Sequence, residues 1–231
     1  MLESDIKIKL IKHLQEKGQV SENSILVSEL TVGNFSRRVD LVIATQKELI
    51  AYEIKSASDN LTRLSGQVED YLKYFDKVIV VADSRHIKSA LQQTPKNVGV
   101  WELSHENFII RRRGTKSSIN EKFALASFLT NAELSKLAQI NHKKINNFKK
   151  DIVIEVTSIK TLRNEVYNCL HRKFSSTSRQ FMNKLNSQLE LKSSDIELLS
   201  IYIPERRAME KKKSLKSQLW EIWEKELSPS I

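Results

Sequence analysis

The segment 37–55, RRVDLVIATQKELIAYEIK, limits the possible folds of this chain more than any other. Its apolar residues alternate with other residues on both sides of a short polar break, and β-branched residues are frequent. This pattern predicts two antiparallel strands joined by a four-residue turn. If Ala44 faces Leu49 across the turn, the same register places Asp40 opposite Glu53.

This predicted register brings like charges together. Side chains directly opposite each other on paired strands lie about 4.5–5.5 Å apart at Cβ, where two carboxylates destabilise the sheet. A divalent cation between Asp40 and Glu53 would remove the conflict. Because side chains alternate along a strand, Lys55 lies on the same face as both acids. The hairpin therefore predicts a cluster of two carboxylates and one ammonium group.

The spacing Asp-x12-Glu-x-Lys on such a hairpin resembles the signature of the PD-(D/E)XK, or restriction-endonuclease-like, nuclease superfamily. The resemblance rests on Asp40, Glu53 and Lys55, because Val39 stands where the signature has its proline. It implies that Asp40, Glu53 and the backbone carbonyl of Ile54 bind Mg²⁺, for which Mn²⁺ can substitute. It also implies that Lys55 orients the attacking water, helps to deprotonate it, or offsets the charge of the phosphate.

The segment 24–32 is predicted to be a strand that runs through a tight turn into the hairpin. If the strand ends pair directly across this turn, Glu29 falls opposite Asp40 and forms a row of acids with Glu53, as we expect for a carboxylate-rich magnesium site. A slip of one residue would turn Glu29 to the other face. Arg38 shares the face of Asp40, and two roles remain open for it: contact with a phosphate, or balance of the acids.

A first helix is predicted over 3–17, because its apolar residues are spaced for one helix face and Gly18 follows it. Many nucleases of the superfamily take a further acid from such a helix, so Glu3 and Asp5 are candidates for the metal site. The preferred alternative is that acids in a first turn simply complement the helix dipole.

A second helix is predicted within 57–75, directly after the strand that carries Lys55. Gln67 and Tyr71 are four residues apart and therefore share one helix face. This pair resembles the motif of the RecB-like, Holliday-junction-resolvase-like branch, in which the two residues lie beside the active site and help to hold the substrate or the catalytic groups. The alternative is that Tyr71 is an ordinary half-buried aromatic residue.

The fold class predicted from these elements is α/β. A continuous apolar strand at 76–82 completes a βαβ unit, and further strands are expected at 98–103 and 108–112. The order αβββαβ is that of the restriction-endonuclease-like core with a mixed sheet. We therefore expect a nuclease-like domain over 1–112 and a basic, all-α domain over 113–231.

The second half of the sequence has helical patterns throughout. Helices are expected at 121–129, 130–139, 158–174, 178–191 and 194–203, with a last helix entered through Pro204. The segment 151–156 fits either a short strand or a buried entry into the next helix. A helix-turn-helix motif near KKINNFKK is less favoured than plain helical packing, because the turn glycine is missing.

The net charge of +10 resides in the second half of the chain. Residues 1–110 contain 14 basic and 15 acidic residues, whereas the remainder contains 24 and 13. An acid cluster next to a basic module suits an enzyme acting on a polyanion, although a solvated basic surface explains the charge equally well. The predicted nucleic-acid contacts are the following arginines and lysines: Arg38, Arg111, Arg112, Arg113, Arg206, Arg207, Lys211, Lys212 and Lys213.

Composition excludes several other classes of protein. One cysteine rules out a disulfide framework, the five histidines show no metal spacing, and no P-loop is present. The longest apolar runs are too short to span a bilayer and the N-terminus lacks a secretory core, so we expect a cytoplasmic protein with no membrane partner.

The function expected from the resemblance is metal-dependent hydrolysis of phosphodiester bonds in DNA. Two alternatives remain: a DNA-binding protein that keeps the nuclease fold without turnover, and a nuclease that its helical half recruits to a larger assembly. A homodimer is also possible, since relatives that cut both strands are often dimeric.

Overall fold

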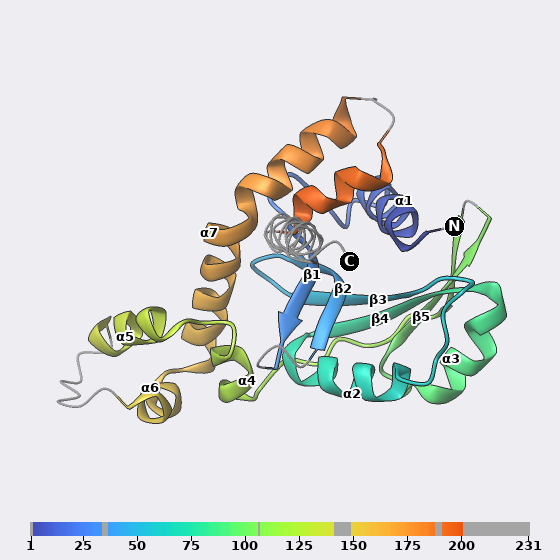
Figure 1. Ribbon diagram of the computed structural model, residues 1–231. Coiled ribbons are helices and arrows are strands. Elements are labelled where there is room, and N and C mark those ends of the chain that lie inside the picture. Colours follow the sequence, from blue (N-terminus) through green and yellow to red (C-terminus); the bar gives the residue numbers. More distant parts are fainter. Residues whose placement is uncertain (1, 34–36, 106, 141–148, 188–190, 201–231) are drawn as a thin grey trace, which may run out of the picture.

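A six-stranded mixed sheet forms the centre of the molecule (Figure 1), with strand order β1-β2-β3-β4-β5-β6. The computed structural model describes residues 2–33, 37–105, 107–140, 149–187 and 191–200. The strands are β1 (Ile25–Val32), β2 (Arg37–Ala44), β3 (Leu49–Lys55), β4 (Lys77–Asp83), β5 (Gly99–Ser104) and β6 (Asn107–Arg112). The pairs β3–β4 and β4–β5 are parallel and the other pairs are antiparallel, which confirms the predicted α/β class with a mixed sheet.

The predicted hairpin register is correct over most of its length. Ala44 pairs with Leu49, and the pairing continues to Leu41 and Tyr52. The expected last pair, Asp40 with Glu53, is absent from the β2–β3 ladder, so this detail of the prediction was wrong. The strands separate there because β2 continues beside β1 while β3 continues beside β4.

Helices cover both faces of the sheet. Figure 1 shows α1 on one face and α2 and α3 on the other, with α7 passing the edge that β1 forms. The helical elements are α1 (Glu3–Glu16), α2 (Leu64–Tyr74), η1 (Ser84–His86), α3 (Ile87–Gln93), α4 (Lys122–Ala126), α5 (Asn131–Ile140), α6 (Lys150–Val156), α7 (Ile159–Asn186) and η2 (Ser193–Leu199).

Each face of the sheet has its own hydrophobic cluster. One cluster connects the sheet with the helices from α2 through α6 and with the first half of α7, for example through Val80, Val68 and Val166. The other joins the sheet to α1, the end of α7 and η2, for example through Leu10 and Phe181. Residues from both sides of the predicted boundary at 112/113 therefore pack in the same clusters, and the division into two domains stays a prediction.

Helix α7 is one continuous helix, whereas the sequence predicted two helices at 158–174 and 178–191. Phe174, Ser178 and Phe181 are all buried on one stripe, so packing holds the helix together across the serine-rich stretch. The Ser178 hydroxyl also donates to the backbone oxygen of Leu26 (3.0 Å) and accepts from its amide (2.9 Å). The serine thus attaches α7 to the edge strand β1 and does not break the helix.

Two other helical predictions needed correction or refinement. The undecided segment 151–156 is helical and belongs to α6. The expected helix at 194–203 is a shorter 3-10 helix, η2, which ends at Leu199 before the extended Ser200, and residues 201–203 lie outside the described residues. The last predicted helix and most of the KKINNFKK segment lie outside the described residues.

A buried aspartate connects the sheet to α7. Asp76 precedes β4, and its Oδ2 accepts from the Leu49 amide (2.8 Å) and from Arg163 NH2 of α7 (2.6 Å). The Asp76 side chain is 0% exposed, whereas that of Arg163 is 25% exposed. A buried charge requires such partners, so this ion pair holds the start of β3 against the start of α7.

The start of α5 is held by the predicted capping box. The Thr130 amide donates to Glu133 Oε2 (2.8 Å), the Glu133 amide donates to Thr130 Oγ1 (3.3 Å), and Arg172 of α7 donates to Glu133 Oε1 (2.7 Å). Burial alone would raise the pKa of Glu133, but the hydrogen bonds from Thr130 and Arg172 outweigh it and lower the pKa to about 2.

We expect Glu133→Ala to lower the free energy of unfolding by about 1–2 kcal/mol at pH 7. Because the pKa of Glu133 is lower in the folded state, its stabilising effect is complete above about pH 4.5 and is lost as the pH falls toward 2. Urea unfolding from pH 7 to about pH 2 measures the difference between native and variant protein across this window. The matched control, Glu165→Ala, removes the other acid paired with Arg172 and should cost less than about 0.5 kcal/mol. A native–variant difference that does not shrink in acid would contradict this account.

Candidate active site

The divergence of β2 and β3 creates the centre of the candidate site. Asp40 lies beyond the last β2–β3 pair, and its Oδ2 accepts from the backbone amide of Ile54 (2.7 Å). The carboxylate therefore replaces a ladder partner and is fixed beside the segment that carries Glu53 and Lys55. Ile54, whose carbonyl is the predicted backbone ligand, is in direct contact with Asp40 through its amide.

Glu53 and Lys55 form a buried pair next to α2. The Lys55 ammonium lies 2.6 Å from Glu53 Oε1, and the Glu53 side chain is 1% exposed. The same ammonium donates to Gln67 Oε1 of α2 (3.1 Å). The predicted side-chain alternation on β3 is confirmed, and Gln67 is brought to the pair as the sequence suggested.

Tyr71 lies one helical turn after Gln67 on α2 and contacts the carboxylate of Glu53. Its hydroxyl is 3.0 Å from Glu53 Oε2 and 2.8 Å from the backbone oxygen of Arg38. A hydroxyl has one hydrogen, so it donates to one of these acceptors at a time. Tyr71 thereby links the two diverging strands at the point where their backbones no longer pair.

Three carboxylates from separate elements meet beside this centre. Glu3 of α1, Glu29 of β1 and Asp40 of β2 each offer an oxygen, and these oxygens lie within 4.8 Å of one another. The β1–β2 pairs on either side of Glu29 keep the predicted register, and Glu29 itself has a φ of 63°. This left-handed conformation is unusual for a residue with a side chain.

Two basic side chains hold Glu29 in this conformation. Lys7 Nζ lies 2.7 Å from Glu29 Oε1, and Arg38 Nε lies 2.5 Å from Glu29 Oε2. Arg38, for which two roles were open, therefore balances an acid in this structure, although 52% of its side chain remains exposed. The other first-turn acid of α1, Asp5, instead bonds the Leu2 amide (3.1 Å) and the Ser193 hydroxyl, so it is directed away from the cluster.

The electrostatics of the cluster favour the uptake of positive charge. Burial and the neighbouring carboxylates of Glu53 and Glu3 raise the pKa of Asp40 well above its ordinary value. Burial also raises the pKa of Glu53, although Lys55 and Tyr71 oppose this shift. A bound cation would relieve the repulsion between carboxylates that contributes to these pKa shifts.

The donor set suits a hard divalent cation. Asp40 and Glu53 provide carboxylate oxygens, and the carbonyl of Ile54 provides a neutral oxygen, which are the ligands that Mg²⁺ prefers. Cysteine and histidine, which favour softer metals, are absent from the acid group that the described residues form. The residues present thus fit Mg²⁺ or Mn²⁺.

The predicted nucleic-acid-binding arginines at the end of the sheet differ in their surroundings. Arg111 pairs with Glu102 across β5 and β6 (2.5 Å). Arg112 donates to the backbone oxygens of Val98 (2.7 Å), Leu91 (3.3 Å) and Thr94 (3.3 Å), so it secures the end of α3. Arg113 is exposed directly after β6. The remaining predicted contacts, Arg206, Arg207, Lys211, Lys212 and Lys213, lie outside the described residues.

Sequence reasoning missed Lys7, which is the most buried basic residue of the cluster. Its side chain is 4% exposed, and its ammonium contacts Glu3 (2.6 Å), Glu29 (2.7 Å) and the Ser28 hydroxyl (3.2 Å). A signal was present, because Lys7 lies on the apolar stripe of α1 with Leu10 and Leu14. A lysine on a buried helix face indicates an acidic partner.

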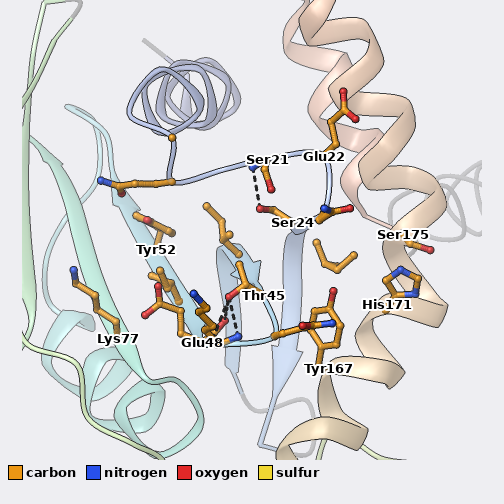
Figure 2. A pocket seen from close by; sticks show the side chains of 18 of the residues that line it. Ser21, Glu22, Ser24, Thr45, Glu48, Tyr52, Lys77, Tyr167, His171 and Ser175 are labelled. Atoms are coloured by element: carbon orange, nitrogen blue, oxygen red, sulfur yellow. Dashed lines mark hydrogen bonds between the residues drawn. The ribbon is translucent and has the colours of Figure 1, made fainter.

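A pocket of about 920 Å³ lies elsewhere, at the turn end of the β2–β3 hairpin. Figure 2 shows Tyr167 and His171 of α7 on one side of this pocket and Glu48 and Lys77 on the other. None of the predicted site residues lines it, and its acids and bases are mixed. The pocket therefore does not point to one ligand chemistry.

The fold and the site define a mixed α/β protein with an acid–lysine cluster where two strands of its sheet diverge. The profile of the family described as Bacteriophage P4 protein cII matches residues 1–200. The curated "Protein cII" of Enterobacteria phage P4 is 32% identical over 206 residues, covering 86% of this chain and 77% of that protein. The chain belongs to the Bacteriophage P4 protein cII family.

A search of solved structures found a weaker similarity. The SPO1766 protein of unknown function from Silicibacter pomeroyi aligns with 62% of this chain and 94% of that chain, at 18% identity and a TM-score of 0.40. This similarity is too low to carry an argument about fold or function. In the described part of the chain, no helix combines the length and apolar composition needed to cross a membrane.

Proposed function

We propose that this protein is a metal-dependent nuclease that hydrolyses phosphodiester bonds in DNA. The observation that carries the proposal is the convergence of Asp40, Glu53 and Lys55, supported by Gln67 and Tyr71, at one point of the sheet. Glu53, Lys55, Gln67 and Tyr71 form one hydrogen-bonded network, and Asp40 joins it through the backbone amide of Ile54. The order of α1, β1 to β3, α2 and β4 further supports a restriction-endonuclease-like core.

Each side chain has a distinct role in this proposal. Asp40, Glu53 and the Ile54 carbonyl hold Mg²⁺, which when bound lowers the pKa of a water and stabilises the charge that builds on the scissile phosphate. Lys55 donates hydrogen bonds to the attacking water or to a phosphate oxygen. Gln67 keeps the ammonium in place, and Tyr71 keeps the carboxylate of Glu53 in place.

DNA is the proposed substrate because of charge and exposure. The chain has a net charge of +10, and a basic surface favours a polyanionic partner through the release of counterions. Arg38 is half-exposed at the rim of the cluster, and Arg113 is exposed at the end of the sheet. Both can donate to phosphates, whereas Arg112 is bound to backbone oxygens.

The test is cleavage of labelled linear, nicked, single-stranded and branched DNA by the full chain. Reactions contain Mg²⁺, Mn²⁺ or a chelator, and a single-stranded RNA is included. Cutting of at least one DNA substrate that requires the metal is the expected result, and the pattern of products identifies the preferred DNA structure. Tight binding to these DNAs without metal-dependent cutting would contradict the proposal and favour a DNA-binding protein without turnover.

We expect Tyr71→Phe to slow cleavage by about 10–100-fold, the usual effect of removing a residue that positions a metal ligand. The variant keeps the buried ring and loses only the hydroxyl beside Glu53 Oε2. Single-turnover rates and Mn²⁺ affinity check the prediction. The control Tyr74→Phe alters another tyrosine of α2, which packs against Phe128, and should leave both quantities unchanged. Equal rates for the two variants would mean that Tyr71 only fills space.

A further inference from the structure

Lys7 has a position that an ordinary surface lysine does not have. It follows Glu3 by one turn of α1, and its side chain is 4% exposed. Its ammonium has three polar partners within 3.2 Å, namely Glu3 Oε1, Glu29 Oε1 and Ser28 Oγ. An ammonium group has three hydrogens, so these contacts use its full capacity to donate.

The partners of Lys7 are the same acids that form the second half of the cluster. Glu3, Glu29 and Asp40 have oxygens within 4.8 Å of one another, which is a spacing that a second metal ion could bridge. In this structure Lys7 and Arg38 take both oxygens of Glu29, and Lys7 also takes Oε1 of Glu3. Glu29 therefore already has a cation at each oxygen, whereas Glu53 has one cation, Lys55, and the neutral hydroxyl of Tyr71.

The charge balance leads to the same conclusion. The whole site contains four carboxylates and three basic side chains, namely Glu3, Glu29, Asp40 and Glu53 with Lys7, Arg38 and Lys55. The net charge of these side chains is small and negative. One bound divalent cation would make it small and positive, which favours binding of a phosphate. A second divalent cation would give a large excess of positive charge beside a buried ammonium, which like-charge repulsion opposes.

We infer that the Lys7 ammonium takes the place of a second metal ion, so that the site would bind one divalent cation, with Asp40 and Glu53 as its proposed carboxylate ligands. This inference rests on the proposed metal site and adds how many ions it holds. Lys7 is a positioning residue: it neutralises Glu3 and Glu29 and holds Glu29 in its left-handed conformation. Its permanent presence makes the second position independent of the metal concentration.

The experiment counts Mn²⁺ bound to the full chain by isothermal titration calorimetry and by the loss of the free Mn²⁺ electron paramagnetic resonance signal. We expect one Mn²⁺ per native chain and two per Lys7→Met chain, since methionine fills the space without a charge. The double variant Lys7→Met/Glu29→Gln removes one cation and one acid together, so it should bind one Mn²⁺ again. Circular dichroism first checks the fold of each variant.

The outcomes separate this inference from the proposed function. Two Mn²⁺ in the native chain, or one in a folded Lys7→Met variant, would overturn the role of Lys7 and leave the nuclease proposal intact. If Lys7→Met does not fold, the count is made on Lys7→Gln, which also removes the charge and keeps a polar side chain beside Glu29 and Ser28. A native chain that binds no Mn²⁺, or an Asp40→Ala variant that binds as much as native, would contradict the metal site itself and the inference with it.

Discussion

Asp40→Asn is expected to reduce metal-dependent DNA cleavage by about 10²–10³-fold or more, the range seen when one preorganised electrostatic group is removed from an active site. The asparagine keeps an oxygen that can accept from the Ile54 amide, so the divergence of the strands is preserved. It loses the negative charge that would bind the proposed cation. Lys55→Met should have an effect of similar size, because it removes the ammonium beside Glu53.

The stability of Asp40→Asn separates a lost function from a lost fold. Burial and nearby acids raise the pKa of Asp40 in the folded protein, so its ionised form destabilises the fold at neutral pH without metal. The variant should therefore unfold at the same or a higher temperature than native in the presence of a chelator. As a control, Asp195→Asn removes the charge of a half-buried acid that pairs with Lys184, and this variant should cleave at the native rate. Native-like cleavage by Asp40→Asn would eliminate the proposed role of this residue.

Asp76→Ala is expected to lower the free energy of unfolding by about 3 kcal/mol, the largest effect on stability that we predict. The substitution removes a fully buried acceptor from the Leu49 amide and leaves Arg163 without its acid. Arg163 is 25% exposed and can be partly hydrated, which keeps the cost at the lower end of the range for a broken buried pair.

Urea unfolding of matched variants shows how much of this loss of stability comes from the lost hydrogen-bond acceptor and how much from the lost charge. Asp76→Asn keeps an acceptor for Leu49 and loses the charge, so it should cost about half as much as Asp76→Ala. Arg163→Met leaves the buried carboxylate unpaired and should also destabilise the protein. If all three variants were as stable as native, the connection between the sheet and α7 would not contribute to folding.

The hairpin could be predicted because its signals are local. Alternation of apolar residues fixed the pairing of Ala44 with Leu49, and the same alternation placed Lys55 beside Glu53. The helical spacing of Gln67 and Tyr71 was sufficient to bring both to this pair, once their helix packed on the strand. Features that depend only on the side-chain periodicity of a single strand or helix could thus be predicted from the sequence.

Features that depend on contacts between distant segments were not predictable in this way. Lys7 meets Glu29 only because α1 packs across the sheet, and the left-handed conformation of Glu29 has no sequence signal. The continuity of α7 depends on the contact of Ser178 with the edge strand β1, which outweighs the low helix propensity of its serine-rich stretch. Beyond the end of the β2–β3 ladder, the Asp40 side chain accepts from the Ile54 amide in place of a backbone oxygen, and the register alone does not show this.

The most direct test of the central claim is a crystal structure of the full chain grown with Mn²⁺, with data collected to locate the metal by its anomalous scattering. The account predicts a Mn²⁺ peak in contact with the carboxylates of Asp40 and Glu53, and the loss of that peak in Asp40→Asn crystals. No peak at these carboxylates under saturating Mn²⁺, or an unchanged peak in the variant, would contradict the account.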